Sequence, residues 1–121
     1  MNTMYAREDY LGADEYVDVV RKSGLNRPVE DRGRVERMLA HANLILTARQ
    51  DGRLVGFARS LTDFSFCCYL SDLAVDKACQ GQGIGKRLIE ETRTAAGGTL
   101  TTTLLLSAPT AMTYYQGIKM P

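Results

Sequence analysis

Three glycines at alternate positions constrain this chain more than any other feature of its sequence. They lie in Gln80-Gly81-Gln82-Gly83-Ile84-Gly85, between an apolar segment that ends at Val75 and an amphipathic segment that begins at Ile84. This pattern predicts a strand, a tight loop and a helix. Glycines lack the Cβ atoms that keep a ligand away from the backbone. The first amides of the helix have no intrahelical partners and the helix dipole adds positive potential, so the loop is suited to bind phosphate.

The glycine spacing differs from that of two common nucleotide-binding loops. A Rossmann fingerprint needs a glycine three positions after Gly83, where this chain has Lys86. A P-loop needs Ser or Thr after the Gly-Lys pair, where this chain has Arg87. On the loop residues alone, a glycine-rich turn without a ligand remains an equal alternative.

Hydrophobic periodicity predicts the remaining elements. Apolar residues at helical spacing indicate two helices before residue 43, one with Ala13, Tyr16, Val17 and Val20 and one with Val35, Met38, Leu39 and Ala42 on the buried face. Strands are predicted over residues 4–7, 44–50, 54–61, 67–75 and 101–106, and a last short helix over about 109–116. Asp51-Gly52 is a hairpin turn signal. The order β-α-α-β-β-β-α-β-α indicates an α+β fold with an antiparallel centre.

Composition indicates one soluble domain over residues 1–121. The chain is 45% hydrophobic and 24% charged, and its net charge of +1 does not favour nucleic-acid or anionic-membrane binding. We expect no membrane span and no signal peptide. The chain has three cysteines, of which Cys67 and Cys68 are adjacent, and this set does not make a disulfide framework. We therefore expect a reduced, cytoplasmic protein. With one His and no Cys-x-x-Cys pair, no metal site is expected.

Two motifs carry a resemblance to a known family. The run from Tyr69 to Val75, followed by Gln80-x-x-Gly83-x-Gly85 and an amphipathic helix, resembles the signature of the GNAT superfamily of N-acetyltransferases. Residues 108–115 resemble the later family motif, an alanine-rich helix that ends in two aromatic residues. The resemblance covers nearly the whole chain. It implies the GNAT acyl-CoA N-acyltransferase fold, a mixed and mostly antiparallel sheet with one splayed parallel pair of strands and helices on both faces.

The resemblance implies a site for acetyl-CoA between the strands 67–75 and 101–106. The backbone that would hold the pantetheine arm belongs to Leu73, Ala74 and Val75. The amides that would hold the pyrophosphate belong to Gln80, Gly81, Gln82, Gly83, Ile84, Gly85 and Lys86.

Two catalytic candidates follow from the same resemblance. Tyr115 matches the family tyrosine that protonates the departing thiolate, and a phenol of pKa about 10 can donate to a thiolate of pKa about 8.5. Asp72 is the acid on the strand 67–75. It has three open roles: a general base, a ligand of the substrate ammonium, or an anchor that holds a loop by hydrogen bonds.

The implied reaction is acetyl transfer from acetyl-CoA to a primary amine of a small molecule, by direct attack in a ternary complex. The acceptor loop should include Leu25, Asn26 and Arg27. Two alternatives remain open. One is a CoA-binding regulatory module without turnover, and the other is an acetyltransferase that acts on a protein N-terminus or lysine.

The chain also departs from the family pattern. Ala108 replaces a common Asn, and Cys79 replaces a common aromatic residue. Members usually continue past the Tyr-Tyr helix with two more strands, whereas this sequence stops at Pro121. The strand 101–106 would then lie at an open edge, which is prone to pair with other chains. We expect either a homodimer that covers this edge or a shortened chain.

Overall fold

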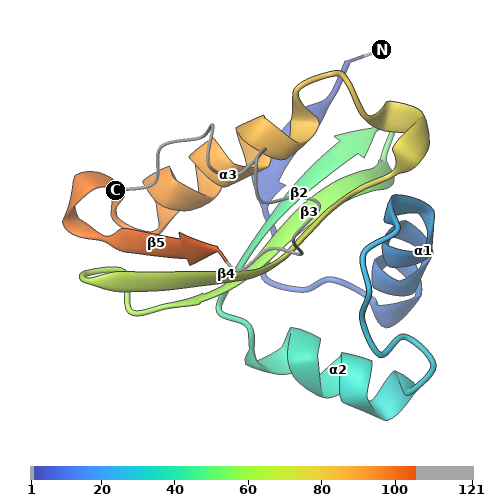
Figure 1. Ribbon diagram of the computed structural model, residues 1–121, viewed down its shortest axis with the longest axis horizontal. Coiled ribbons are helices and arrows are strands. Elements are labelled where there is room, and N and C mark those ends of the chain that lie inside the picture. The colour runs from blue at the N-terminus through green and yellow to red at the C-terminus, as the bar shows by residue number, and fades with distance from the viewer. Residues whose placement is uncertain (1, 106–121) are drawn as a thin grey trace.

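The computed structural model describes residues 2–105 (Figure 1). The elements follow the order β1 (Met4–Arg7), α1 (Ala13–Ser23), α2 (Arg32–His41), β2 (Leu44–Gln50), β3 (Arg53–Thr62), β4 (Cys67–Val75), η1 (Lys77–Cys79), α3 (Ile84–Ala95), η2 (Gly98–Leu100) and β5 (Thr102–Leu105). This order confirms the predicted elements within that range. The predicted helix 109–116, with Tyr115 and the departure at Ala108, lies outside the described residues.

The strands form one mixed sheet in the order β1-β2-β3-β4-β5. Every neighbouring pair is antiparallel except β4 and β5, which are parallel. In Figure 1, α1 and α2 lie on one side of the sheet and α3 on the other. The predicted fold class, a mostly antiparallel sheet with one parallel pair and helices on both faces, is therefore confirmed.

The hairpin between β2 and β3 turns at the predicted dipeptide. Asp51 has a φ of 52° and Gly52 a φ of 80°, the left-handed values that this type of turn needs. The predicted strand 54–61 is one residue longer at each end, over Arg53–Thr62. Asp63 then closes the next loop, because its carboxylate accepts hydrogen bonds from the amides of Ser65, Phe66 and Cys67.

Each face of the sheet carries its own hydrophobic core. On the α3 side, Leu88 and Ile89 of α3 are fully buried against the strands, as the helical spacing predicted. On the other side, the rings of Tyr16 and Phe57 lie 5.0 Å apart between α1 and β3. The predicted stripe of α1 is corrected in one position: Val19 is buried, and Val17 is only half-buried at its edge.

A β-bulge in β4 changes which face of the sheet the alternate residues of this strand point to, so that β4 contributes to both cores. Arg59 pairs with Asp72 and the next residue, Ser60, pairs with Leu70, so Ser71 is the extra residue. Leu70 packs in the core under α3, whereas Ala74 packs in the core under α1. Within residues 2–105 the last β4–β5 pair, Leu70 with Leu105, directly precedes this bulge.

Candidate active site

Strand β4 continues beyond the part that pairs with β5. Parallel pairing extends from Cys67 with Thr102 to Leu70 with Leu105, and β4 runs on to Val75. On its other side this extension still pairs with β3, for example Leu73 with Ala58. No strand within residues 2–105 pairs with the edge of the extension that would face β5. This is where the pantetheine-binding backbone of Leu73, Ala74 and Val75 is predicted, and that role stays a prediction.

The glycine loop connects the end of β4 to the start of α3. Gly81 and Gly83 have φ angles of 85° and 79°, which side chains other than glycine rarely adopt. A Cβ at either position would meet nothing within 4 Å, so the loop surface is open there. Gly83 is the N-cap of α3, and no described side chain caps this helix start. No described side chain therefore uses the first amides of α3, which can accept an anion, and their role in binding the pyrophosphate stays a prediction.

Gln50 contacts the glycine loop through a hydrogen bond to Gln82, a contact that was not predicted from the sequence. Its side chain is buried at the end of β2, and Nε2 donates hydrogen bonds to Thr3 Oγ1 at 3.0 Å and Gln82 Oε1 at 3.2 Å. The thiol of Cys79 lies 3.7 Å from Gln50 Oε1. The available signal was a polar residue at the end of an apolar strand.

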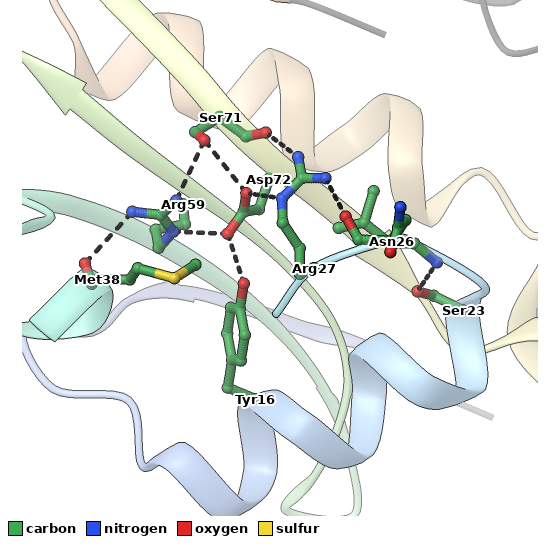
Figure 2. A network of polar contacts seen from close by, with 9 residues as sticks. Tyr16, Ser23, Asn26, Arg27, Met38, Arg59, Ser71 and Asp72 are labelled. Atoms are coloured by element: carbon green, nitrogen blue, oxygen red, sulfur yellow. Dashed lines mark hydrogen bonds and ion pairs between the residues drawn. The ribbon is translucent and has the colours of Figure 1, made fainter. Parts of the chain in front are cut away.

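Asp72 lies at the centre of a buried polar cluster, which we call the Asp72 cluster: Tyr16, Arg27, Arg59 and Asp72 (Figure 2). Its side chain has no exposed surface. Oδ1 accepts from Arg27 Nε at 2.7 Å, and Oδ2 accepts from Arg59 Nε at 2.6 Å and Tyr16 Oη at 2.7 Å. The bulge makes this possible, because it turns Asp72 toward α1 rather than α3.

The cluster keeps Asp72 ionised and Tyr16 neutral. Burial alone would raise the pKa of Asp72, but hydrogen bonds and charge from Arg59, with those from Arg27 and Tyr16, lower that pKa below its usual value. Burial, followed by the nearby charge of Asp72, raises the pKa of Tyr16. The Ser71 hydroxyl also donates to Oδ1 at 3.2 Å, and a carboxylate with a lowered pKa and four donors is a poor proton acceptor. Of the three roles open to Asp72, these contacts favour the loop anchor.

The loop in question is the predicted acceptor loop between α1 and α2. Arg27 Nη2 donates to the carbonyl of Ser71 at 2.6 Å, and Nη1 donates to the carbonyl of Asn26 at 2.6 Å. Leu25 is half-buried against the α1-side core, and Asn26 is exposed. The structure thus brings Arg27 and Asp72 together at the bulge, next to the last β4–β5 pair within residues 2–105.

Arg59 extends the same cluster to α2. Nη1 donates to the carbonyl of Met38 at 3.3 Å, and Nη2 donates to Ser71 Oγ at 3.1 Å. Sequence analysis did not identify Tyr16 or Arg59 as part of a polar site, because Tyr16 belongs to an apolar stripe. An arginine inside the apolar strand β3 was the signal that was available.

Three free cysteines lie within residues 2–105: Cys67 is exposed, and Cys68 and Cys79 are buried. No group of three His, Cys, Asp or Glu residues within residues 2–105 could hold a metal ion. None of the described helices is both long enough and apolar enough to cross a membrane.

Comparison with known proteins identifies the family. The family model described as an acetyltransferase (GNAT) domain matches residues 19–118. This match covers most of the chain, and the chain therefore belongs to the GNAT acetyltransferases.

Curated relatives match parts of the chain. It is 31% identical over 100 residues to the uncharacterized N-acetyltransferase ycf52 of Porphyra purpurea, covering 76% of this chain and 54% of that protein. It is 49% identical over 39 residues to the histone acetyltransferase TAP1 of Glycine max, covering 32% of this chain and 17% of that protein. The chain spans about half the length, or less, of these relatives.

Solved structures share the fold at low identity. A probable acetyltransferase of Staphylococcus aureus has a TM-score of 0.81 at 21% identity, covering 99% of this chain and 91% of that one. The PaiA N-acetyltransferase of Thermoplasma acidophilum, in complex with coenzyme A, has a TM-score of 0.74 at 16% identity, covering 97% and 88%. An aminoglycoside acetyltransferase from an uncultured soil metagenomic sample, in complex with sisomicin, has a TM-score of 0.70 at 19% identity, covering 97% and 87%.

Proposed function

We propose that this chain transfers the acetyl group of acetyl-CoA to a primary amine of a small molecule, by direct attack in a ternary complex. The observation that carries the proposal is that β4 extends past its last pair with β5 within residues 2–105, and that the glycine loop then leads to a start of α3 that no described side chain caps. An extended ligand with a phosphate group at one end fits this arrangement. The family and the coenzyme A-bound relative support the same cosubstrate.

In this proposal the backbone of the extended strand holds the pantetheine arm. Leu73 and Val75 frame the segment, with Ala74 between them buried toward α1. The pyrophosphate lies on the amides of residues 80–86, at the positive end of the α3 dipole. The thioester then lies near the Ser71 bulge, beside the loop that carries Arg27.

The reaction needs one proton donor and one proton acceptor. The amine nitrogen forms a bond to the thioester carbon, the carbon–sulfur bond breaks, and the thiolate leaves. We assign the proton on that thiolate to Tyr115, which lies outside the described residues. We assign Asp72 to holding the loop, so the proton of the attacking amine passes to water.

The acceptor class, location and assembly are also proposals. A small-molecule amine is supported by the aminoglycoside acetyltransferase among the similar structures. We propose a cytoplasmic protein, because all its cysteines in the described residues are free thiols. We further propose a homodimer that covers β5, which is the last strand of the sheet in residues 2–105.

The test is release of free thiol from acetyl-CoA in the presence of a panel of primary amines. Wild-type protein should release thiol with at least one amine, and Tyr115→Phe should slow that release by about 100-fold or more while binding of CoA is unchanged. Tight binding of acetyl-CoA without release for any amine or protein substrate would instead indicate a regulatory module. Acetylation confined to a protein N-terminus or lysine would replace the small-molecule acceptor.

A further inference from the structure

The Asp72 cluster carries an unbalanced positive charge. Two guanidinium groups, those of Arg27 and Arg59, share the single carboxylate of Asp72. The fourth member, Tyr16, donates its hydroxyl hydrogen to the same carboxylate and is neutral. The Asp72 cluster therefore has one more positive than negative group, and its net charge is positive.

The acids of α1, of α2 and of the loop between them have other partners. Glu15 pairs with Arg49, and Asp31 caps α2 by accepting from the amide of Arg34. Asp18 pairs with Lys22 at 3.0 Å, and Glu30 pairs with Arg21 at 3.2 Å. Asp14 and Glu36 both pair with Arg32. The Lys77 side chain adds a further positive charge beside the loop, because its Cε and Nζ would lie 3.2 and 3.3 Å from a Cβ at Gly24.

A carboxylate of a bound ligand would balance this excess charge.

Arg27 is the arginine that such a molecule can reach. Its side chain is 26% exposed, against 8% for Arg59. Within residues 2–105, its hydrogen bonds to Asp72, Asn26 and Ser71 use three of the five N–H donors of a guanidinium. One donor on Nη1 and one on Nη2 remain for a ligand, and guanidinium groups bind carboxylates well.

We propose that Arg27 binds a carboxylate of the acceptor, so that the acceptor is an amine that also carries a carboxylate, as an α-amino acid does. This inference rests on the acetyltransferase function proposed above. The carboxylate would lie at the Ser71 bulge, beside the predicted place of the thioester. A polyamine, in contrast, would bring further positive charge to Arg27, Arg59 and Lys77, and is disfavoured.

The experiment compares three kinds of acceptor with acetyl-CoA: the common α-amino acids, the carboxamides of the same amino acids, and spermidine. We expect at least one amino acid to be acetylated with a kcat/KM at least about tenfold above that of its carboxamide, since a hydrogen bond to a charged group carries this difference. Arg27→Gln should remove the preference by raising KM for the amino acid. Because Arg27 also anchors the acceptor loop, the rate with the carboxamide can fall too. The readout is therefore the ratio of kcat/KM for the amino acid to that for its carboxamide, which should approach one in Arg27→Gln.

Two further variants keep the test interpretable. Arg27→Lys retains the charge without the planar fork and should keep part of the preference. Arg32→Gln removes an arginine that is 60% exposed on α2, and should leave the preference intact. Circular dichroism shows whether each variant is folded. If Arg27→Gln is unfolded, the inference is tested by two other results: the preference of the wild type for the amino acid over its carboxamide, and the reduced preference of Arg27→Lys.

Three outcomes would overturn the inference: preference for spermidine, equal rates for acids and carboxamides, or no reaction with any amino acid by a protein that binds acetyl-CoA. Failure to bind acetyl-CoA at all would contradict the proposed function itself. Calorimetric titration with acetyl-CoA, made on the same preparation, separates the two kinds of failure.

Discussion

Arg59 Nε lies 2.6 Å from Asp72 Oδ2, and this buried ion pair joins β3 to β4 at the bulge. The same carboxylate holds α1 through Tyr16, and the same guanidinium holds α2 through the carbonyl of Met38. Arg27 attaches the loop between these helices. One set of contacts therefore fixes both helices and the predicted acceptor loop to the centre of the sheet.

Removing one partner of this pair should destabilise the protein strongly. Arg59→Met leaves a buried carboxylate with less compensating charge, so we expect the free energy of unfolding to fall by about 3 kcal/mol. Urea denaturation measures this change. The matched control is Arg32→Met on the exposed side of α2, which should change stability by no more than about 0.5 kcal/mol. Equal losses in the two variants would contradict a structural role for the Asp72 cluster.

Stability should depend on the charge of Asp63 in acid. Hydrogen bonds from the backbone amides of Phe66, Ser65 and Cys67 lower the pKa of Asp63 to about 2. The pKa of this group is lower in the folded chain than the unfolded value of about 3.9, so its stabilising effect is present above about pH 4. That effect is lost as pH falls toward the folded pKa.

Thermal unfolding between about pH 5 and pH 2 tests this linkage. Asp63→Asn should lose less stability over that range than the wild type does, because it has no carboxylate to protonate. Identical pH profiles for the two proteins would show that the three amide hydrogen bonds do not act on Asp63 in solution.

The contact between Gln50 and Gln82 should matter for the nucleotide end of the cosubstrate. Gln50→Leu removes a hydrogen bond of 3.2 Å to the glycine loop, and we expect about threefold to tenfold weaker binding of CoA. Acetyl-pantetheine lacks the pyrophosphate, so its use as a donor should be unaffected. If Gln50→Leu weakened the use of acetyl-CoA and of acetyl-pantetheine equally, Gln50 would stabilise the fold as a whole rather than the glycine loop.

Local sequence patterns predicted the elements well. Strands 44–50 and 67–75 and the helix start at Ile84 have the predicted bounds. The alternation of apolar residues and the glycine-rich loop are local signals, and local backbone geometry follows from them. Arg87 and Glu91 of α3, four residues apart, pair at 2.9 Å, which is the spacing at which neighbouring helical turns bring such side chains together.

The polar interior could not be predicted in the same way. Residues 68, 70, 72 and 74 alternate with more exposed residues and are all buried, a pattern that suggests one face of a regular strand. The bulge at Ser71 divides them between two faces, and it is visible only in the pairing with β3. Contacts such as Tyr16 with Asp72 join residues 56 positions apart, and no local pattern encodes them.

The central claim is that acetyl-CoA binds to the glycine loop and to the edge of β4 after Leu70, which pairs with no other strand within residues 2–105. Calorimetric titration of the purified chain with acetyl-CoA and with CoA tests it directly, on wild type, Gly83→Glu and Gly52→Glu. Both glycines have φ near +80° and open space around the missing Cβ, so the two variants carry similar backbone strain at different places. Gly83→Glu also brings a carboxylate to the helix start where the pyrophosphate is predicted.

We predict wild-type binding with a Kd of roughly micromolar order, which corresponds to about −8 kcal/mol. Gly83→Glu should weaken it by at least about tenfold through charge repulsion and a blocked loop surface, and Gly52→Glu should bind as the wild type does. No binding of acetyl-CoA or CoA by folded wild-type protein, or equal weakening in both variants, would contradict the site.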